Sequence, residues 1–223
     1  EMVKGFMLTN VAGNKFSLRA RRIVRALGRD EIEKMLGVAI SGGVDYVGFE
    51  SLNSITNAGN RFEKESGLLS IWTVGMMRAT PKTVVVVPFK TGTKTDAYEM
   101  INADYFGRVP SDRLKIDTEK GVAFFRGDGK NRGKIGIGPK YAKEFLGSWM
   151  PELESLTIVT YSLPANAEEL DYVNSMWEIQ KEPYKGDVVN SYNDGPAGQN
   201  GEQIGQFYEL ETSSPALELG PSD

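Results

Sequence analysis

The sequence predicts an all-β protein, a large antiparallel β-sandwich with one short helix. About a dozen short runs rich in β-branched and aromatic residues are separated by turn signals at intervals of roughly 8–15 residues. Only one segment has a clear helical pattern, which argues against alternating β and α units. The composition changes nowhere abruptly enough to mark a boundary. We therefore expect residues 1–223 to form a single sandwich domain.

The amino-terminal region is predicted to hold two strands, the helix and a third strand. Residues 2–9 and 16–24 read as strands, the second with charged residues on its outer face. Asp30 can cap a helix over residues 31–36, whose acidic first turn suits the helix dipole. Residues 44–56 alternate well enough for a long strand.

The central region is predicted to build the core. Residues 68–76 form a strongly apolar strand, and residues 84–87 are four consecutive valines. An unbroken run of this kind is typical of a strand buried on both faces. We therefore expect residues 84–87 to form a central strand, with Ile71 and Trp72 in the neighbouring strand contributing to the core.

Two hairpins and a glycine-containing strand follow. Residues 114–116 and 122–125 flank one turn, and residues 141–149 and 155–163 flank another. Between these hairpins, residues 135–137 alternate isoleucine with glycine, which allows close approach by another backbone.

The last part of the chain is predicted to end in two neighbouring strands. Residues 171–180 fit a helix or a strand, and we interpret the part from Trp177 onward as a strand. Residues 188–192 form a short β-run, which the sequence N-D-G-P then ends. Residues 204–212 form the second strand of the pair.

Composition excludes several classes of function. The net charge of −4 argues against nucleic-acid binding, because no basic excess exists to neutralise phosphates. The chain contains neither cysteine nor histidine, so thiolate chemistry and histidine-based catalysis or metal binding are excluded within it. No apolar run is long enough to span a membrane. We expect a small-molecule partner, no cofactor and no metal.

The two ends of the sequence look cut, and we expect a piece of a longer protein whose export signal has been lost. A chain without cysteine is compatible with both cytoplasm and periplasm. The sequence favours a periplasmic or secreted location only slightly.

Strand alternation predicts a polar site near the carboxyl end. Glu209 and Glu211 are two residues apart, so both carboxylates lie on one face of the strand. The glycine-rich loop at residues 195–201 lets the two terminal strands lie close together, with the segment at residues 190–195 closing the site. We expect the side chains of three further residues to approach Glu211: Asn190, Tyr192 and Asn193. The alternative is a solvated strand face.

Aromatic and basic residues supply further candidates for the site. Trp149 lies at a strand end and is the tryptophan best suited to stack on a sugar from the surface. Arg132 and Lys134 belong to a basic loop at residues 126–134 that could bind an anionic group, or simply be solvated. The oxygen-bearing side chains at residues 187–194 leave a calcium site open, although turn formation explains them equally well.

The carboxyl end also resembles a known family. The segment L-E-T at residues 210–212, followed by P-A and then L-E-L-G-P, is similar to the end of the galactose mutarotases, or aldose 1-epimerases. Ser213 stands where that family has glutamine, and Gly220-Pro221 is inverted. Over most of its length the chain resembles an uncharacterised bacterial group predicted to share the mutarotase-like supersandwich fold.

This resemblance implies a sugar-binding cleft on a concave sheet face, with Glu211 in the position of the general base. The family's acid is a histidine, assisted by a second histidine, and neither exists in this chain. Two hypotheses therefore stay open. The protein is either a carbohydrate-processing, epimerase-like enzyme, or a sugar-binding or structural module that has kept the fold without the acid.

Overall fold

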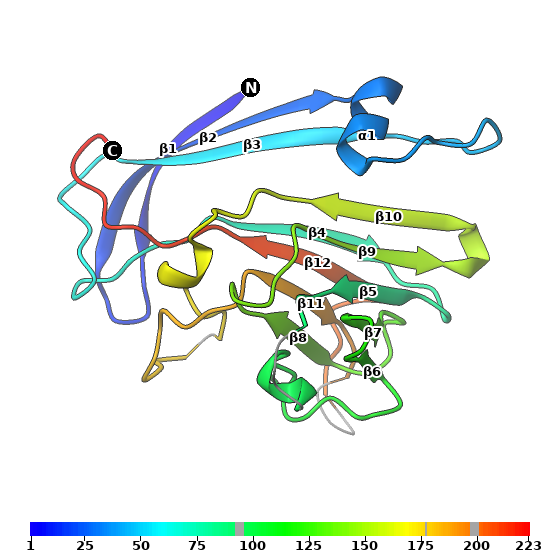
Figure 1. The fold of residues 1–223 in the computed structure, drawn as a ribbon. Helices are drawn as coiled ribbons and strands as arrows, with labels where there is room; N and C mark the ends of the chain where they lie inside the picture. The colour runs from blue at the N-terminus through cyan, green and yellow to red at the C-terminus, as the bar shows by residue number, and fades with distance from the viewer. Residues whose placement is uncertain (92–95, 177, 197–200) are drawn as a thin grey trace. The chain divides into compact units, whose positions relative to one another are not determined.

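The part of the chain that the structure describes is predominantly β, with one α-helix and three antiparallel sheets (Figure 1). The computed structural model describes residues 1–91, 96–176, 178–196 and 201–223. The all-β sandwich class predicted from the sequence is confirmed. The described residues form two compact units, where the sequence showed no boundary. The first unit comprises Glu1–Ile71 with Glu218–Asp223, and the second comprises Trp72–Leu217.

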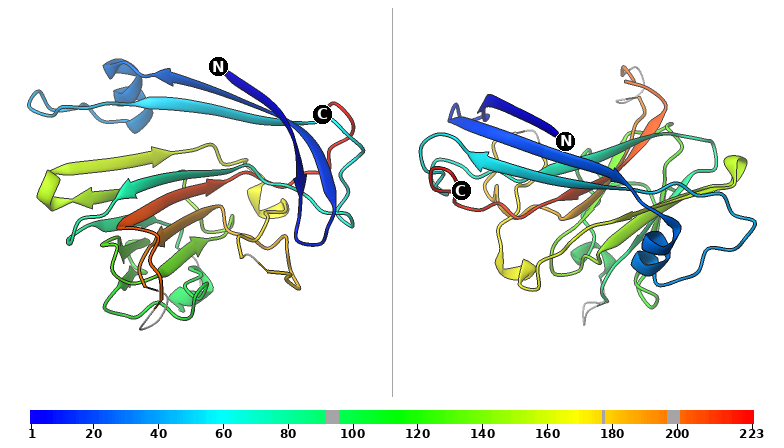
Figure 2. Two further views of the ribbon diagram at one scale, coloured as in Figure 1. Left: turned by 180° about the vertical axis from the view of Figure 1, so that it is seen from behind. Right: turned by 90° about the horizontal axis from the view of Figure 1, so that it is seen from above.

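The first unit is a three-stranded sheet with a helix. Its strands are β1 (Met2–Thr9), β2 (Lys15–Ala26) and β3 (Phe49–Asn57), in the order β1-β2-β3. Figure 2 shows β2 and β3 side by side along their length. A small core forms where the rings of Phe16 and Phe62 meet edge to face, with centroids 5.0 Å apart.

Two boundaries in the first unit differ from the sequence prediction. Helix α1 (Arg29–Leu36) is capped by Gly28 rather than Asp30, because the Glu31 carboxylate accepts a hydrogen bond from the Gly28 backbone at 3.0 Å. The third strand begins at Phe49, later than predicted. Just before it, the backbone at Gly48 passes so close to Ile32 of α1 that a Cβ there would lie 2.7 Å from the isoleucine.

The second unit is a sandwich of two sheets. The five-stranded sheet has the order β10-β9-β5-β7-β6, and the four-stranded sheet the order β4-β12-β11-β8. The two predicted hairpins are present as β6-β7 and β9-β10. The strands are β4 (Trp72–Arg78), β5 (Val84–Pro88), β6 (Leu114–Asp117), β7 (Val122–Arg126), β8 (Gly133–Ile137), β9 (Phe145–Met150), β10 (Ser155–Thr160), β11 (Val189–Asn193) and β12 (Phe207–Ser213).

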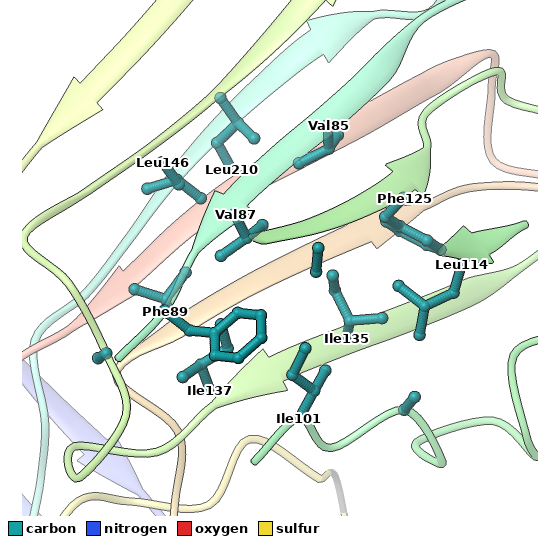
Figure 3. Close-up of a cluster of buried hydrophobic side chains, with 14 of the residues drawn as sticks. Val85, Val87, Phe89, Ile101, Leu114, Phe125, Ile135, Ile137, Leu146 and Leu210 are labelled. Carbon is teal, nitrogen blue, oxygen red and sulfur yellow. The ribbon is translucent and has the colours of Figure 1, made fainter. Parts of the chain in front are cut away.

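The main core lies between these two sheets. Figure 3 shows Val85 and Val87 of β5 among side chains from both sheets, including Ile135 and Ile137 of β8 and Leu210 of β12. Strand β5 is the central strand of its sheet, as predicted. It is not buried on both faces, since its valines alternate between buried and half-buried.

The predicted core position of Trp72 is wrong. The neighbours of β5 are β7 and β9, whereas Trp72 begins β4, at the edge of the other sheet. Its side chain points away from the core and is 45% exposed. The inward positions of β4 carry Thr73, Gly75 and Met77, and Met77 packs against the main core.

Two further predictions concern the strand expected from Trp177 onward and membrane-spanning segments. Trp177 lies outside the described residues, and the described residues from 178 to 180 form no strand. In the described part of the chain, no helix is long and apolar enough to cross a membrane. Short 3-10 turns occur at Ala97–Glu99, Pro151–Leu153 and Ala167–Glu169.

Candidate functional site

The candidate site lies on the face of the four-stranded sheet that points away from the main core. We call this surface the polar face. Alternation along β12 turns Tyr208 and Leu210 toward the core and Glu209 and Glu211 to the polar face. Glu211 pairs with Asn190 of β11 on one side and with β4 on the other.

Glu211 is the most buried group of the polar face, with 0% of its surface exposed. Its Oε2 accepts a hydrogen bond from Lys134 Nζ at 2.7 Å and a second from Trp72 Nε1 at 2.9 Å. Among the described residues, Glu211 Oε1 has no hydrogen-bond partner although it is buried. A buried acceptor without a donor costs free energy.

Two aromatic rings flank the ammonium group that holds Glu211. Lys134 Nζ lies 5.5 Å from the centroid of the Trp72 ring and 5.3 Å from that of Tyr105. Only 7% of the Lys134 side chain is exposed, so the ion pair with Glu211 is shielded from water. The charge of Lys134 is therefore already balanced within the site.

Glu209 lies beside Glu211 on the polar face, opposite Tyr192 in the strand pairing. It is half-buried. Burial and, secondly, the neighbouring charge of Glu211 raise the pKa of Glu209 to about 7, against a smaller opposing effect of Lys134. Glu209 can therefore hold a proton near neutral pH.

A second cluster of polar side chains, formed by Tyr105, Asp187 and Asn190, adjoins the cluster around Glu211. The Tyr105 hydroxyl donates a hydrogen bond to Asp187, and Asn190 Nδ2 donates to the Tyr105 hydroxyl at 2.9 Å. Burial raises the pKa of Asp187 to about 6. There is no room for a side chain at Gly136, where a Cβ would overlap with Asp187 Oδ2.

An open pocket of about 390 Å³ meets this second group. Asp187 and Asn102 contribute to its wall, together with the rings of Tyr98 and Tyr141. Asn190 bonds to Tyr105 and pairs with Glu211 across the sheet, so the pocket wall and the carboxylate site share one hydrogen-bonded framework.

The whole chain, residues 1–223, matches the model of a family described as "Family of unknown function (DUF6786)". The protein belongs to this family. No curated protein and no solved structure gives a match.

In this DUF6786 member, the structure brings together most of the residues that the sequence proposed. Glu209, Glu211, Asn190, Tyr192 and Lys134 all lie on the polar face, in adjacent strands. The segment expected to close the site is largely strand β11 instead of a loop, and of the glycine-rich loop, residues 197–200 lie outside the described residues.

Asn193 does not belong to the site. It lies one residue out of phase with Tyr192, so alternation turns its side chain to the opposite face. There it is fully buried, accepts a hydrogen bond from the Gly129 backbone at 2.9 Å and donates to the Asn131 carbonyl at 2.8 Å. Its role is to hold the loop that precedes β8.

The structure places Arg132 and Trp149 away from the group around Glu211. The Arg132 guanidinium lies over the ring of Phe106, 4.0 Å from its centroid, and Phe106 in turn packs against Tyr192. Arg132 therefore lies near Tyr192 of the polar face. Trp149 belongs to β9 in the other sheet, paired with Val84, so the structure does not bring it together with Glu211.

The basic side chains at residues 126–134 do not gather into one anion site, and the oxygen-bearing side chains at residues 187–194 do not gather into one cation site. Lys134 is paired with Glu211, whereas Arg126 donates to the Asp112 carbonyl. Within the described residues, no group of three or more acidic side chains is placed to hold a metal ion. Asp194, one of the calcium candidates, accepts from the Tyr192 hydroxyl instead.

Sequence reasoning missed Trp72 and Tyr105. Trp72 reaches Glu211 from β4, and Tyr105 comes from an irregular segment far away in the chain. The one available signal was the period-two spacing of Trp72, Val74 and Met76, which marks a common strand face without saying which face is buried.

Proposed function

We propose that the protein binds a carbohydrate on the polar face, with Glu211 at the centre of the site. The observation that carries this proposal is the buried Glu211 Oε1, which lacks a donor among the described residues. A sugar presents several hydroxyl donors, and a hydrogen bond to a charged acceptor is worth about 1.5–3 kcal/mol. The other oxygen of the same carboxylate is held in place by Lys134 and Trp72.

The surroundings of Glu211 also support a sugar. The Trp72 ring is 45% exposed beside the carboxylate, and Val74 and Met76 continue an exposed apolar stripe along the same edge of β4. Sugar rings have apolar faces that pack on aromatic rings while their hydroxyls hydrogen-bond at the rim. An exposed ring next to a fixed carboxylate offers both kinds of contact.

The charge balance of the site favours a neutral ligand. Lys134 and Glu211 compensate each other at 2.7 Å, so neither is free to attract an ion of opposite charge. Asp187 is held by the Tyr105 hydroxyl and lines the open pocket. A neutral polyhydroxylated molecule can exchange hydrogen bonds with these groups without adding net charge to a buried site.

The test is a binding screen by isothermal titration calorimetry with reducing monosaccharides, their methyl glycosides and short oligosaccharides. For a sugar that binds, Glu211→Gln should weaken the affinity by about tenfold or more. Trp72→Ala should weaken it through lost stacking, and Trp72→Phe should recover part of the loss. The matched control is Glu119→Gln, in the exposed turn between β6 and β7.

Glu211→Gln also removes the counter-charge of Lys134, so its fold must be checked by circular dichroism before binding is compared. The two Trp72 variants keep the ion pair and test the same site independently. A sugar whose affinity changes in none of these variants would place its binding elsewhere. Failure of the whole panel to bind would favour the structural-module hypothesis.

A further inference from the structure

The pocket beside the cluster of Tyr105, Asp187 and Asn190 contains a buried carboxyl group with one unused oxygen. Asp187 is only 9% exposed and lines this pocket of about 390 Å³. The Tyr105 hydroxyl and Asn102 Nδ2 both donate to Asp187 Oδ2, the second at 3.4 Å. Within the described residues, no hydrogen bond ends on Oδ1. A Cβ on Gly138, which also lines the pocket, would lie 3.6 Å from Oδ1, so this oxygen faces the glycine.

Asp187 also has no counter-charge of its own. The positive charge that acts on it is that of Lys134, which is already bound to Glu211 at 2.7 Å. Within the described residues, no lysine or arginine forms an ion pair with Asp187. Burial raises the pKa of this carboxyl group to about 6, so it is still largely ionised at about pH 7. A cation placed at Oδ1 would supply the charge that the buried carboxylate lacks.

The charges around the pocket favour a cation as well. Its described lining carries the carboxyl groups of Glu99, Glu168 and Asp187 against the ammonium group of Lys140. That ammonium group lies 5.4 Å from the ring centroid of Tyr141, and the Arg108 guanidinium lies 3.5 Å from that of Tyr98. These two cations therefore contact aromatic rings and leave the charge of Asp187 uncompensated.

We propose that this pocket binds a ligand with a primary ammonium group, which donates to Asp187 Oδ1 while the apolar body of the ligand packs against the rings of Tyr98 and Tyr141. A hydrogen bond between an ammonium group and a carboxylate is about twice as strong as one between neutral groups. The volume of the pocket suits a small organic molecule. The inference does not rest on the proposed function, which concerns Glu211, where Lys134 already balances the charge.

The backbone holds the wall of the pocket in place. Asn102 and Gly136 exchange two backbone hydrogen bonds, at 2.9 and 2.8 Å. Ile101 and Ile137, next to Asn102 and Gly138 in the chain, belong to the main core (Figure 3). A wall fixed on two segments lowers the ordering cost of binding, so a single charged contact can produce measurable affinity.

The experiment is a ¹H–¹⁵N NMR titration with three probes of similar shape: benzylamine, which is a cation at neutral pH, neutral benzyl alcohol and anionic benzoate. At about pH 7.5, benzylamine should bind with a Kd of about 1 mM, at least tenfold more tightly than benzyl alcohol, and benzoate should bind more weakly than either. The amide signals that shift should include those of Asn102 and Gly138. Near pH 5 the advantage of benzylamine should shrink, because Asp187 is then protonated.

Two variants test the named oxygen. Asp187→Asn should weaken benzylamine about tenfold and change benzyl alcohol by less than about twofold. Asp112→Asn, the same change at an exposed position outside the pocket lining, should leave both affinities unchanged. Gly138→Ala keeps the carboxylate and narrows the space before Oδ1, so it should weaken benzylamine about fivefold.

Gly138→Ala keeps the test valid if Asp187→Asn fails to fold, because the added Cβ makes only an ordinary contact. Equal affinity for benzylamine and benzyl alcohol would overturn the inference. So would benzylamine affinity that neither variant changes, shifts confined to residues outside the pocket, or no binding of benzylamine up to about 10 mM. None of these results would bear on sugar binding at Glu211.

Discussion

The buried ion pair between Lys134 and Glu211 gives the sharpest test of this site through stability alone. Replacing Lys134 by Met removes the ammonium group 2.7 Å from a carboxylate that is completely buried. The remaining donor to that carboxylate is the Trp72 indole. We expect Lys134→Met to lower the free energy of unfolding by about 3–5 kcal/mol, the usual cost of leaving one partner of a buried pair alone.

The magnitude follows from the geometry. At 2.7 Å and an effective dielectric constant of about 20, the attraction between the two charges is about 6 kcal/mol. Desolvation of the two groups offsets part of this attraction.

Urea denaturation followed by circular dichroism and tryptophan fluorescence measures the effect. The double variant Lys134→Met/Glu211→Leu removes both charges and should recover most of the stability that the single variant loses. Lys120→Met is the matched control, because Lys120 pairs with Asp117 at 3.5 Å while 79% exposed and should cost less than about 1 kcal/mol. A loss below about 1 kcal/mol for Lys134→Met, or additive losses in the double variant, would refute the buried-pair argument.

Three more changes test the surrounding structure. Gly136→Ala should destabilise the fold by about 2–3 kcal/mol in thermal denaturation, since its Cβ would overlap with Asp187 Oδ2, whereas Gly42→Ala, with open space around it, should change little. Burial raises the pKa of Asp187 to about 6, so the folded state holds this proton more tightly and stability should fall as the pH rises from about 4 to about 6, by an amount on the order of 3 kcal/mol. In Asp187→Asn, stability should not fall with pH in this way. If it still does, another titratable group is responsible for the pH dependence. Trp72→Ala should cost only about 1–2 kcal/mol, below the roughly 3–5 kcal/mol of a buried aromatic residue, and a larger loss measured in urea would contradict its placement on the polar face.

The sequence could predict which residues of each strand share a face of the site, because side chains alternate along a strand. The period of two fixes which residues of β12 share a face, and Glu209 and Glu211 do share one. The pairing of β11 with β12 also followed from the turn chemistry between them. The same rule, applied one residue further along β11, would have excluded Asn193, which lies out of phase with Asn190.

Alternation does not say which face of a strand meets the core. In β4 the residues Trp72, Val74 and Met76 share one face, whereas the apolar character of residues 68–76 had predicted Trp72 in the core. In the structure, this face points away from the core, because Gly75 pairs with Leu210 of β12, whose side chain is in the core. Thr73, Gly75 and Met77 face the packed side, so residue size alone does not distinguish the two faces of β4.

Contacts across the sheet decide what the carboxyl groups of β12 can do, and these depend on strand order, which the sequence did not reveal. Lys134 reaches Glu211 because β8 pairs with β11, and Trp72 reaches it because β4 pairs with the opposite edge of β12. A shift of one residue in the pairing of β12 would turn Glu211 into the apolar core and Leu210 out to Lys134. The cost of burying that charge among apolar side chains excludes the shifted pairing. The ion pair and the apolar core thus select the same register, which places Glu209 beside Glu211.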